Sequence, residues 1–261
     1  MHRKLFFFGF IATALNNSAP SMSEPSLSPD PGSVVGTIHS PGALAAALNL
    51  PPGALDYLEL RVDAFAPDPS LLERLERAAP RLGAPCVLTV RHPAEGGAGG
   101  LETGQRAALY RRWLPQARLV DLELRSAREL AEIVRETRES GRALILSHHD
   151  FEATPTPNRL RELHGRAAQE GASVFKVATM TRTARDLATL LSFLVEGGES
   201  GGPAIAVMGM GSFGKLSRLT LGRSGSVLNY GYLDEVQVPG QWPAEELKRR
   251  LAELAPGAAT L

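Results

Sequence analysis

From residue 33 onward, short apolar runs rich in β-branched residues alternate with segments in which apolar positions recur every three or four residues. The alternation repeats about every 25–30 residues, which is typical of strand–helix units and a parallel sheet. The pattern therefore predicts an α/β fold. Eight runs are expected to be strands: SVVGTIH, DYLELRVDAF, PCVLTVRH, RLVDLELRS, ALILSHHDF, SVFKVATM, AIAVMGM and SVLNYGYL.

Helical patterns follow nearly all of these runs, for instance at 70–79, 128–140, 183–195 and 244–254. The seventh unit is the weakest, because GSFGKLSRLTLG leaves room for only a short helix. Residues 197–202, GGESGG, are expected to be a loop insertion. Eight consecutive units predict a (β/α)8 TIM barrel, a single catalytic domain over residues 33–261, with an open doubly wound sheet as the alternative.

The first residues follow a different pattern. A basic start precedes the eleven-residue apolar stretch Leu5–Leu15, which matches the core of a signal peptide and is too short to span a bilayer as a helix. No clear small-x-small cleavage site follows, and Met22 offers a shorter start. Three interpretations stay open: a start assigned too far upstream, an export signal and an organellar transit peptide. In each of them, residues 1–32 are expected to be a disordered leader outside the fold.

Charge and cysteine content narrow the function classes. The 261 residues include 28 basic and 28 acidic side chains, a balance that gives no electrostatic footprint for nucleic acid or an anionic membrane surface. The expected partner is a small soluble molecule. The lone Cys86 cannot form an intramolecular disulfide, and no Cys/His cluster has metal-ligand spacing, so no metal is expected.

Charged side chains gather at the ends of the expected strands, where a closed parallel barrel holds its catalytic groups. Glu59, Arg61 and Asp63 are spaced by two, which puts all three on one face of a strand. Asp121 and Glu123 share a face for the same reason. One such residue is more often part of a structural ion pair than a catalytic group. Their convergence on one end of a barrel favours a functional site.

Lys176 stands alone within the apolar run VFKVA. Burying an unpaired ammonium is costly, so such a lysine snorkels, is paired, or is held neutral for chemistry. We expect the neutral amine, which is the form that attacks a carbonyl. His148 and His149 are adjacent and point to opposite faces, so at most one enters the barrel. Met208 and Met210 share a strand face and are ordinary core residues in most proteins.

Several motifs, taken together and in order, resemble the type I 3-dehydroquinate dehydratase family. They cover nearly all of residues 33–243 and read ELRVD, TVRHPAEGG, DLEL, SHHDF followed by TP, FKVA, MGMGSFGKLSR and PGQ. The resemblance implies a (β/α)8 barrel without metal or organic cofactor, usually a homodimer. It also implies a cytoplasmic lyase, unless Leu5–Leu15 exports it, that dehydrates 3-dehydroquinate to 3-dehydroshikimate in the shikimate pathway to chorismate and the aromatic amino acids.

Roles carry over to the positions that match the family's motifs. The resemblance makes Lys176 the amine that forms a Schiff base with the substrate carbonyl. It makes His149 the base for the C2 proton and later the acid for the departing hydroxyl, with Glu95 orienting it. His148 is then the non-catalytic neighbour. Substrate contacts are implied for Glu59, Arg61, Arg91, Arg218, Gln237 and Gln241, and supporting roles for Asp121, Glu123, Met208 and Met210.

One position departs from the family pattern. Before PGQ the family commonly has Ser-Ala, whereas this chain has Gln237 and Val238, so a longer amide replaces a small hydroxyl donor. The lysine and histidine chemistry is untouched by this change. Closure of the loop and the affinity for the substrate carboxylate are the properties it puts in doubt.

Two other functions compete with this interpretation. A class I aldolase acting on a sugar phosphate would also use a lysine imine, and MGMGSFGK could imitate a phosphate-binding loop. Arg61, Arg91 and Arg218 suit a carboxylated polyol better. A barrel that only binds a ligand is the third reading, and the intact set of Lys176, His149 and Glu95 argues against it.

Overall fold

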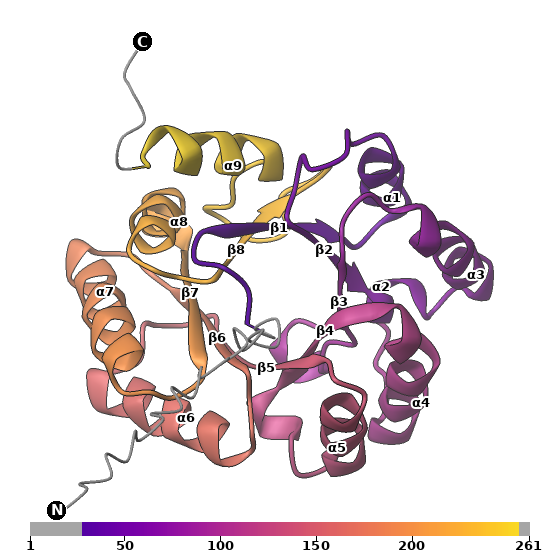
Figure 1. Cartoon of the computed structure of the whole chain (residues 1–261), viewed down its shortest axis with the longest axis horizontal. Helices are drawn as coiled ribbons and strands as arrows, with labels where there is room; N and C mark the ends of the chain where they lie inside the picture. The colour runs from indigo at the N-terminus through magenta and orange to yellow at the C-terminus, as the bar shows by residue number, and fades with distance from the viewer. Residues whose placement is uncertain (1–27, 256–261) are drawn as a thin grey trace, which may run out of the picture.

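A computed structural model describes residues 28–255 of the chain. Eight parallel strands lie side by side at the centre of a ring of helices (Figure 1). Each strand falls inside the run predicted for it, except that β4 begins one residue earlier. The strands are β1 (Ser33–Ile38), β2 (Tyr57–Arg61), β3 (Cys86–Thr89), β4 (Ala117–Glu123), β5 (Ala143–Asp150), β6 (Val174–Met180), β7 (Ala204–Met210) and β8 (Leu228–Tyr232).

The sheet closes into a barrel. Its order is β7-β6-β5-β4-β3-β2-β1-β8, so β1 pairs with both β2 and β8. The β7 and β8 ends meet through the Val227 N–H, which donates to the Ile205 carbonyl at 3.0 Å. The Ser226 hydroxyl also accepts from the Val207 N–H at 3.0 Å. The barrel prediction is confirmed, and the open doubly wound sheet is excluded.

Helices cover the outside of the barrel (Figure 1). Of the helices in residues 28–255, none is long and apolar enough to cross a membrane. The α-helices are α1 (Pro41–Leu48), α2 (Val62–Phe65), α3 (Pro69–Ala78), α4 (Thr103–Trp113), α5 (Ala131–Glu139), α6 (Pro157–Gln169), α7 (Ala184–Glu199), α8 (Gly214–Arg223) and α9 (Ala244–Glu253), and the 3-10 turns are η1 (Ala79–Arg81), η2 (Pro93–Glu95), η3 (Leu114–Gln116), η4 (Leu124–Ser126) and η5 (Gly211–Phe213).

The second strand is shorter than predicted. It ends at Arg61, and Val62–Phe65 forms a helical turn in which the Ala66 N–H donates to the Val62 carbonyl. The prediction that Asp63 shares a strand face with Glu59 and Arg61 is therefore wrong. Apolar residues continue through this segment, so periodicity alone cannot tell where the strand gives way to the turn.

Two predictions after β6 and β7 also need correction. Residues 197–199 belong to α7, not to a loop. Gly197 is buried there, and a Cβ at this position would lie only 2.3 Å from Ile205 Cδ1. The glycine lets the helix end pack directly on β7. Helix α8 is ten residues long rather than short, because the glycine-rich segment forms the turn η5 that leads straight into it.

The core has two layers, and β6 shows how the strands separate them. Phe175 and Val177 point outward into the large cluster between the sheet and the helices, whereas Val174 and Ala178 join the cluster inside the barrel. Because strand side chains alternate in direction, Lys176 must point inward with Val174 and Ala178. The alternation thus delivers one charge to the barrel interior.

A substitution at Gly231 tests the packing of β8 on α9. A Cβ there would lie 2.6 Å from Ala244 Cα and 2.9 Å from the Trp242 carbonyl oxygen, which are backbone atoms. We expect Gly231→Ala to lower the free energy of unfolding by about 1–3 kcal/mol in urea denaturation. Gly198→Ala is the control, because Gly198 lies on α7 with open space around it, and helix propensity should raise stability by up to about 1 kcal/mol. Equal effects of the two changes would contradict this packing.

Candidate active site

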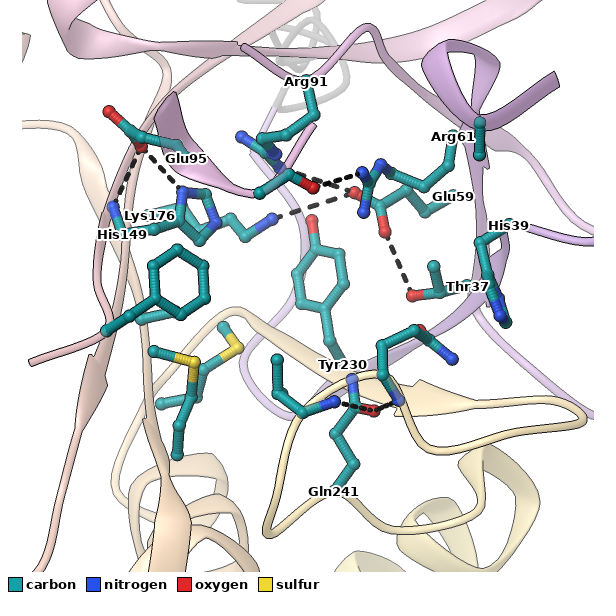
Figure 2. Close-up of a pocket in the computed structure, with 18 of the residues that line it drawn as sticks. Thr37, His39, Glu59, Arg61, Arg91, Glu95, His149, Lys176, Tyr230 and Gln241 are labelled. Atoms are coloured by element: carbon teal, nitrogen blue, oxygen red, sulfur yellow. Dashed lines mark hydrogen bonds and ion pairs between the residues drawn. The ribbon is translucent and has the colours of Figure 1, made fainter. Parts of the chain in front are cut away.

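A cavity of about 570 Å³ lies at the carboxyl ends of the strands (Figure 2). Side chains reach it from six strands and from the loops that follow them. Two predicted supporting residues, Asp121 and Glu123, are fully buried behind its wall. The other predicted site residues all line the cavity: Glu59, Arg61, Arg91, Glu95, His149, Lys176, Met208, Met210, Arg218, Gln237 and Gln241.

Lys176 is buried and paired. Its Nζ lies 2.7 Å from Asp121 Oδ2, 3.9 Å from Glu59 Oε1 and 3.9 Å from the centre of the Tyr230 ring. Burial alone would raise the pKa of Asp121, but Arg91 and Lys176 outweigh it and hold that pKa below its ordinary value. The contacts of the amine are those of an ammonium with a carboxylate. Our expectation of a lysine kept neutral by an apolar strand missed this partner.

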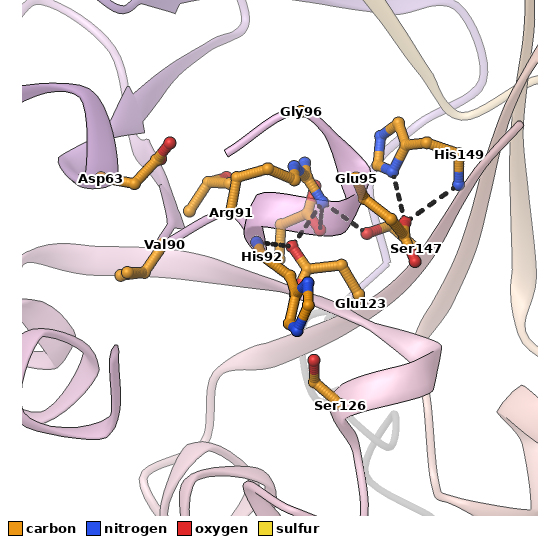
Figure 3. A network of polar contacts seen from close by, with 12 residues as sticks. Asp63, Val90, Arg91, His92, Glu95, Gly96, Glu123, Ser126, Ser147 and His149 are labelled. Atoms are coloured by element: carbon orange, nitrogen blue, oxygen red, sulfur yellow. Dashed lines mark hydrogen bonds and ion pairs between the residues drawn. The ribbon is translucent and has the colours of Figure 1, made fainter. Parts of the chain in front are cut away.

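Arg91 connects Asp121, the partner of Lys176, to Glu123 and Ser147, and Figure 3 shows it beside the last two residues. Its guanidinium donates to both oxygens of Asp121, at 3.0 and 3.3 Å, to Glu123 at 3.0 Å and to the Ser147 hydroxyl at 2.8 Å. Glu123 also pairs with Arg106 from α4. Alternating charges of opposite sign, each within hydrogen-bonding distance of the next, make this fully buried cluster tolerable.

His149 and Glu95 form the second group in the cavity (Figure 3). His149 Nδ1 lies 2.9 Å from Glu95 Oε2, and the His149 backbone N–H donates to the same oxygen at 3.1 Å. Burial, reinforced by Glu123, raises the pKa of Glu95 to about 7. Burial, with the Arg91 and Lys176 cations, lowers the pKa of His149 well below its ordinary value. The imidazole is therefore neutral and is fixed through one nitrogen.

Strand register separates the two adjacent histidines. Ser147 pairs with Lys176 and His149 with Ala178 across β5 and β6, so His149 shares the interior face. His148 pairs with Val177 on the outer face and does not line the cavity. The phenyl ring of Phe151 stacks near the His149 ring, with centroids 6.3 Å apart and planes 16° apart.

Glu59 and Arg61 are held by local partners. Glu59 accepts from the hydroxyls of Thr37, at 3.0 Å, and Thr89, at 2.9 Å. Arg61 forms two hydrogen bonds to Asp63, at 2.9 and 2.8 Å, and a third to the Gly96 carbonyl. The helical turn after β2 thus brings Asp63 to Arg61 although the two do not share a strand.

Arg218 differs from the other arginines of the site. In residues 28–255 all its hydrogen bonds go to backbone carbonyls, those of Tyr230, Gly209, Gly214 and Gly240, at 2.7–3.1 Å. Burial lowers the pKa of Arg218 to about 10, which still leaves it charged at neutral pH. Its positive charge therefore faces the cavity without a carboxylate of the described chain.

The loop before α9 is organised by Gln241. Its Oε1 accepts from the backbone N–H groups of Gln237, at 2.9 Å, and Val238, at 3.3 Å. The Gln237 side-chain amide donates to the Glu235 carbonyl, so this hydrogen bond lies within the loop. Gln241 is buried at the cavity wall and fixes the loop by its oxygen, which leaves its amide nitrogen for a ligand.

Several cavity residues were not singled out from the sequence. Thr37 lies in β1 and His39 directly after it, and no charged residue at the end of that strand drew attention to them. Tyr230 looked like one more apolar position of β8. Phe151 is part of the SHHDF motif but was given no role. Arg106, the buried partner of Glu123 behind the cavity, was missed as well, because it is one of three arginines in α4 and no feature of the sequence marks it as the buried one.

Fold and site together define a class of protein: a (β/α)8 barrel enzyme with a buried lysine amine and a neutral imidazole in one cavity. The family model for type I 3-dehydroquinase matches residues 39–256, and the chain belongs to that family. The lyase predicted from the motifs is confirmed by this match: the chain is a 3-dehydroquinate dehydratase of type I, in the shikimate pathway.

Known relatives agree in sequence and in structure. The 3-dehydroquinate dehydratase of Aquifex aeolicus (strain VF5) is 36% identical over 197 residues, 74% of this chain and 84% of that protein. That of Thermococcus gammatolerans is 32% identical over 223 residues, 85% and 98% of the two chains. A crystal structure of the Clostridium difficile type I enzyme with covalently modified comenic acid superposes with a TM-score of 0.77 at 26% identity, covering 87% of this chain and 92% of that one.

The His149–Glu95 pair predicts a pH dependence. When Glu95 is ionised, Nδ1–H donates to it and Nε2 keeps its lone pair; when Glu95 is protonated, its O–H donates to Nδ1 and Nε2 carries the proton. We expect kcat/KM to rise with pH through an apparent pKa of about 7. Glu95→Gln should remove this acid limb and lower the plateau, measured from pH 5 to 9. An unchanged limb in that variant would contradict the assignment.

Proposed function

We propose that the chain dehydrates 3-dehydroquinate to 3-dehydroshikimate through an imine at Lys176, with His149 as the base. The observation that carries the proposal is a single buried lysine amine in the same cavity, and on the same face of two paired strands, as a neutral imidazole. Family membership supplies the substrate. The cavity of about 570 Å³ suits a ligand of that size.

Imine formation begins at Lys176. The amine nitrogen bonds to the C3 carbonyl carbon, the carbonyl oxygen takes two protons in all from the lysine ammonium, and water leaves a protonated iminium. Asp121, 2.7 Å from Nζ, stabilises the cation before and after the step. The iminium is an electron sink, and it makes the neighbouring C2 proton acidic.

His149 performs the elimination. Its Nε2 removes the C2 proton, and the electrons of that bond form an enamine. The enamine then expels the C1 hydroxyl, which takes the proton from His149 and departs as water. A second water hydrolyses the product iminium and frees Lys176. Glu95 holds Nδ1 at 2.9 Å, so the nitrogen that accepts the proton is fixed before the substrate arrives.

Arg218 supplies the site for the substrate carboxylate. It is a buried cation whose charge no carboxylate in residues 28–255 neutralises. Its Nε and Nη1 hydrogens bond to backbone carbonyls, so Nη2 is the nitrogen that donates to the substrate carboxylate. Met208 and Met210 form an apolar surface beside it. The polar groups of Glu59, Arg61, Arg91 and Gln241 lie at the cavity wall and hold the substrate hydroxyls.

The proposal extends to the assembly and setting of the enzyme. A cytoplasmic homodimer is supported by the family resemblance of the motifs. The catalytic domain of residues 33–261 is supported by the start of β1 at Ser33 and by a family match that begins at residue 39. The questions raised by Leu5–Leu15 and Met22 lie outside the described residues.

Trapping the imine tests the role of Lys176. Borohydride added with 3-dehydroquinate should inactivate the protein and add the mass of the reduced adduct at Lys176, located by peptide mass spectrometry. Lys176→Ala should lose both labelling and turnover, whereas Lys215→Ala should keep both. Lys215 is the matched control because it lies on α8 with its Nζ over the Trp242 ring, outside the cavity. An adduct at Lys215 instead would reject the assignment.

Replacing each histidine tests the register of β5. His149→Ala should lower kcat by roughly 10²–10⁴-fold yet still form a trappable imine, because lysine attack and C2 proton removal are separate steps. His148→Ala should have a mild effect, since His148 pairs with Val177 on the outer face. Steady-state kinetics with imine trapping of both variants measures this. Reversed phenotypes would place the catalytic imidazole on the other face of the strand.

A further inference from the structure

Tyr230 lines the cavity beside Lys176 (Figure 2). It is in β8, and its ring belongs to the cluster inside the barrel. The ring is buried, with 4% of the residue exposed, and its centre is 3.9 Å from Lys176 Nζ. A phenylalanine would provide the same ring face to the ammonium. The contact with Lys176 therefore does not explain why this residue carries a hydroxyl.

The Tyr230 hydroxyl has no hydrogen-bond partner among residues 28–255, although it is buried. Tyr110 shows the usual arrangement, because its hydroxyl donates to the Asp121 carbonyl at 2.8 Å and accepts from the Val90 N–H. A buried polar group without a partner is unfavourable and needs an explanation. At Tyr230 the explanation lies in the cavity, where a ligand oxygen can take the place of the missing partner.

The charged groups around the amine do not serve as a neutral donor to such an oxygen. Glu59 and Asp121 are carboxylates, which only accept when ionised. The Arg91 guanidinium is already engaged by Asp121, Glu123 and Ser147. Burial raises the pKa of the Tyr230 phenol well above its ordinary value, and Glu59 and Asp121 raise it further, so the O–H keeps its proton.

We propose that the Tyr230 hydroxyl donates a hydrogen bond to the substrate oxygen on the carbon that Lys176 attacks, and thereby assists imine formation. This rests on the proposed function. As the C–N bond forms, the electrons of the carbonyl double bond move to that oxygen, and Tyr230 stabilises the developing charge. The two protons that convert the oxygen into water come from the lysine ammonium. Tyr230 begins and ends the step with its own proton.

The experiment separates imine formation from the later elimination. In a His149→Ala background, where the C2 proton stays in place, the imine accumulates and its rate of appearance is followed by rapid quenching with borohydride and intact-mass spectrometry. Adding Tyr230→Phe should slow this rate roughly 10- to 100-fold, the effect of losing one donor to a developing oxyanion. The same substitution in the otherwise unchanged enzyme should lower kcat/KM without lowering the melting temperature, because the hydroxyl bonds to no described residue.

Tyr232→Phe is the matched control, since Tyr232 ends the same strand and does not line the cavity. It should leave the rate of imine formation as it was. An equal rate with and without the Tyr230 hydroxyl would overturn the inference, and so would a lower kcat/KM with unchanged imine formation, which would place the hydroxyl at a later step. Failure to trap any imine in the unsubstituted enzyme would instead reject the proposed function itself.

Discussion

The ion pair between Lys176 and Asp121 is the interaction on which the site depends. An ammonium inside a barrel is tolerated only when an opposite charge and hydrogen bonds replace the water it has lost. Asp121 supplies the charge at 2.7 Å, but Asp121 is itself fully buried and needs Arg91, which in turn needs Glu123 and Arg106. One reactive amine thus requires a chain of four further charges, which reaches from the barrel interior to helix α4.

Because the five charges depend on one another, substituting one of them lowers stability more than replacing the whole set by apolar residues would. Loss of a single member leaves its neighbour as an uncompensated buried charge, which costs about 3–5 kcal/mol in comparable buried pairs. The same chain of charges also links Lys176 electrostatically to His149. Arg91 and Lys176 are among the groups that lower the pKa of His149, so the cluster that holds the Lys176 amine also keeps the His149 imidazole neutral.

The sequence was sufficient to predict the barrel and most of the cavity wall. Alternating apolar runs report burial on both faces of a strand, and a charge within such a run stands out, as Lys176 did. The family resemblance of the motifs then predicted His149, Glu95 and Arg218 as site residues, and all three line the cavity. The features that were missed depend on three-dimensional proximity. They are the helical turn that brings Asp63 to Arg61, the burial of Arg106 rather than another arginine of α4, and the Tyr230 hydroxyl, which has no partner in the described part of the chain. No local pattern encodes such contacts.

Arg218 has a mechanical consequence beyond its charge. Its guanidinium joins the Gly209 carbonyl of β7, the Tyr230 carbonyl of β8 and the Gly240 carbonyl of the following loop. The ends of β7 and β8 meet through the Val227–Ile205 backbone hydrogen bond and the Ser226 hydroxyl, so the arginine adds a side-chain link across this junction of the barrel. An anionic ligand that binds Arg218 would stabilise this link between the two strands. Ligand binding in the cavity and local opening of the β7–β8 junction are then linked equilibria, so a filled cavity raises the free energy of that opening.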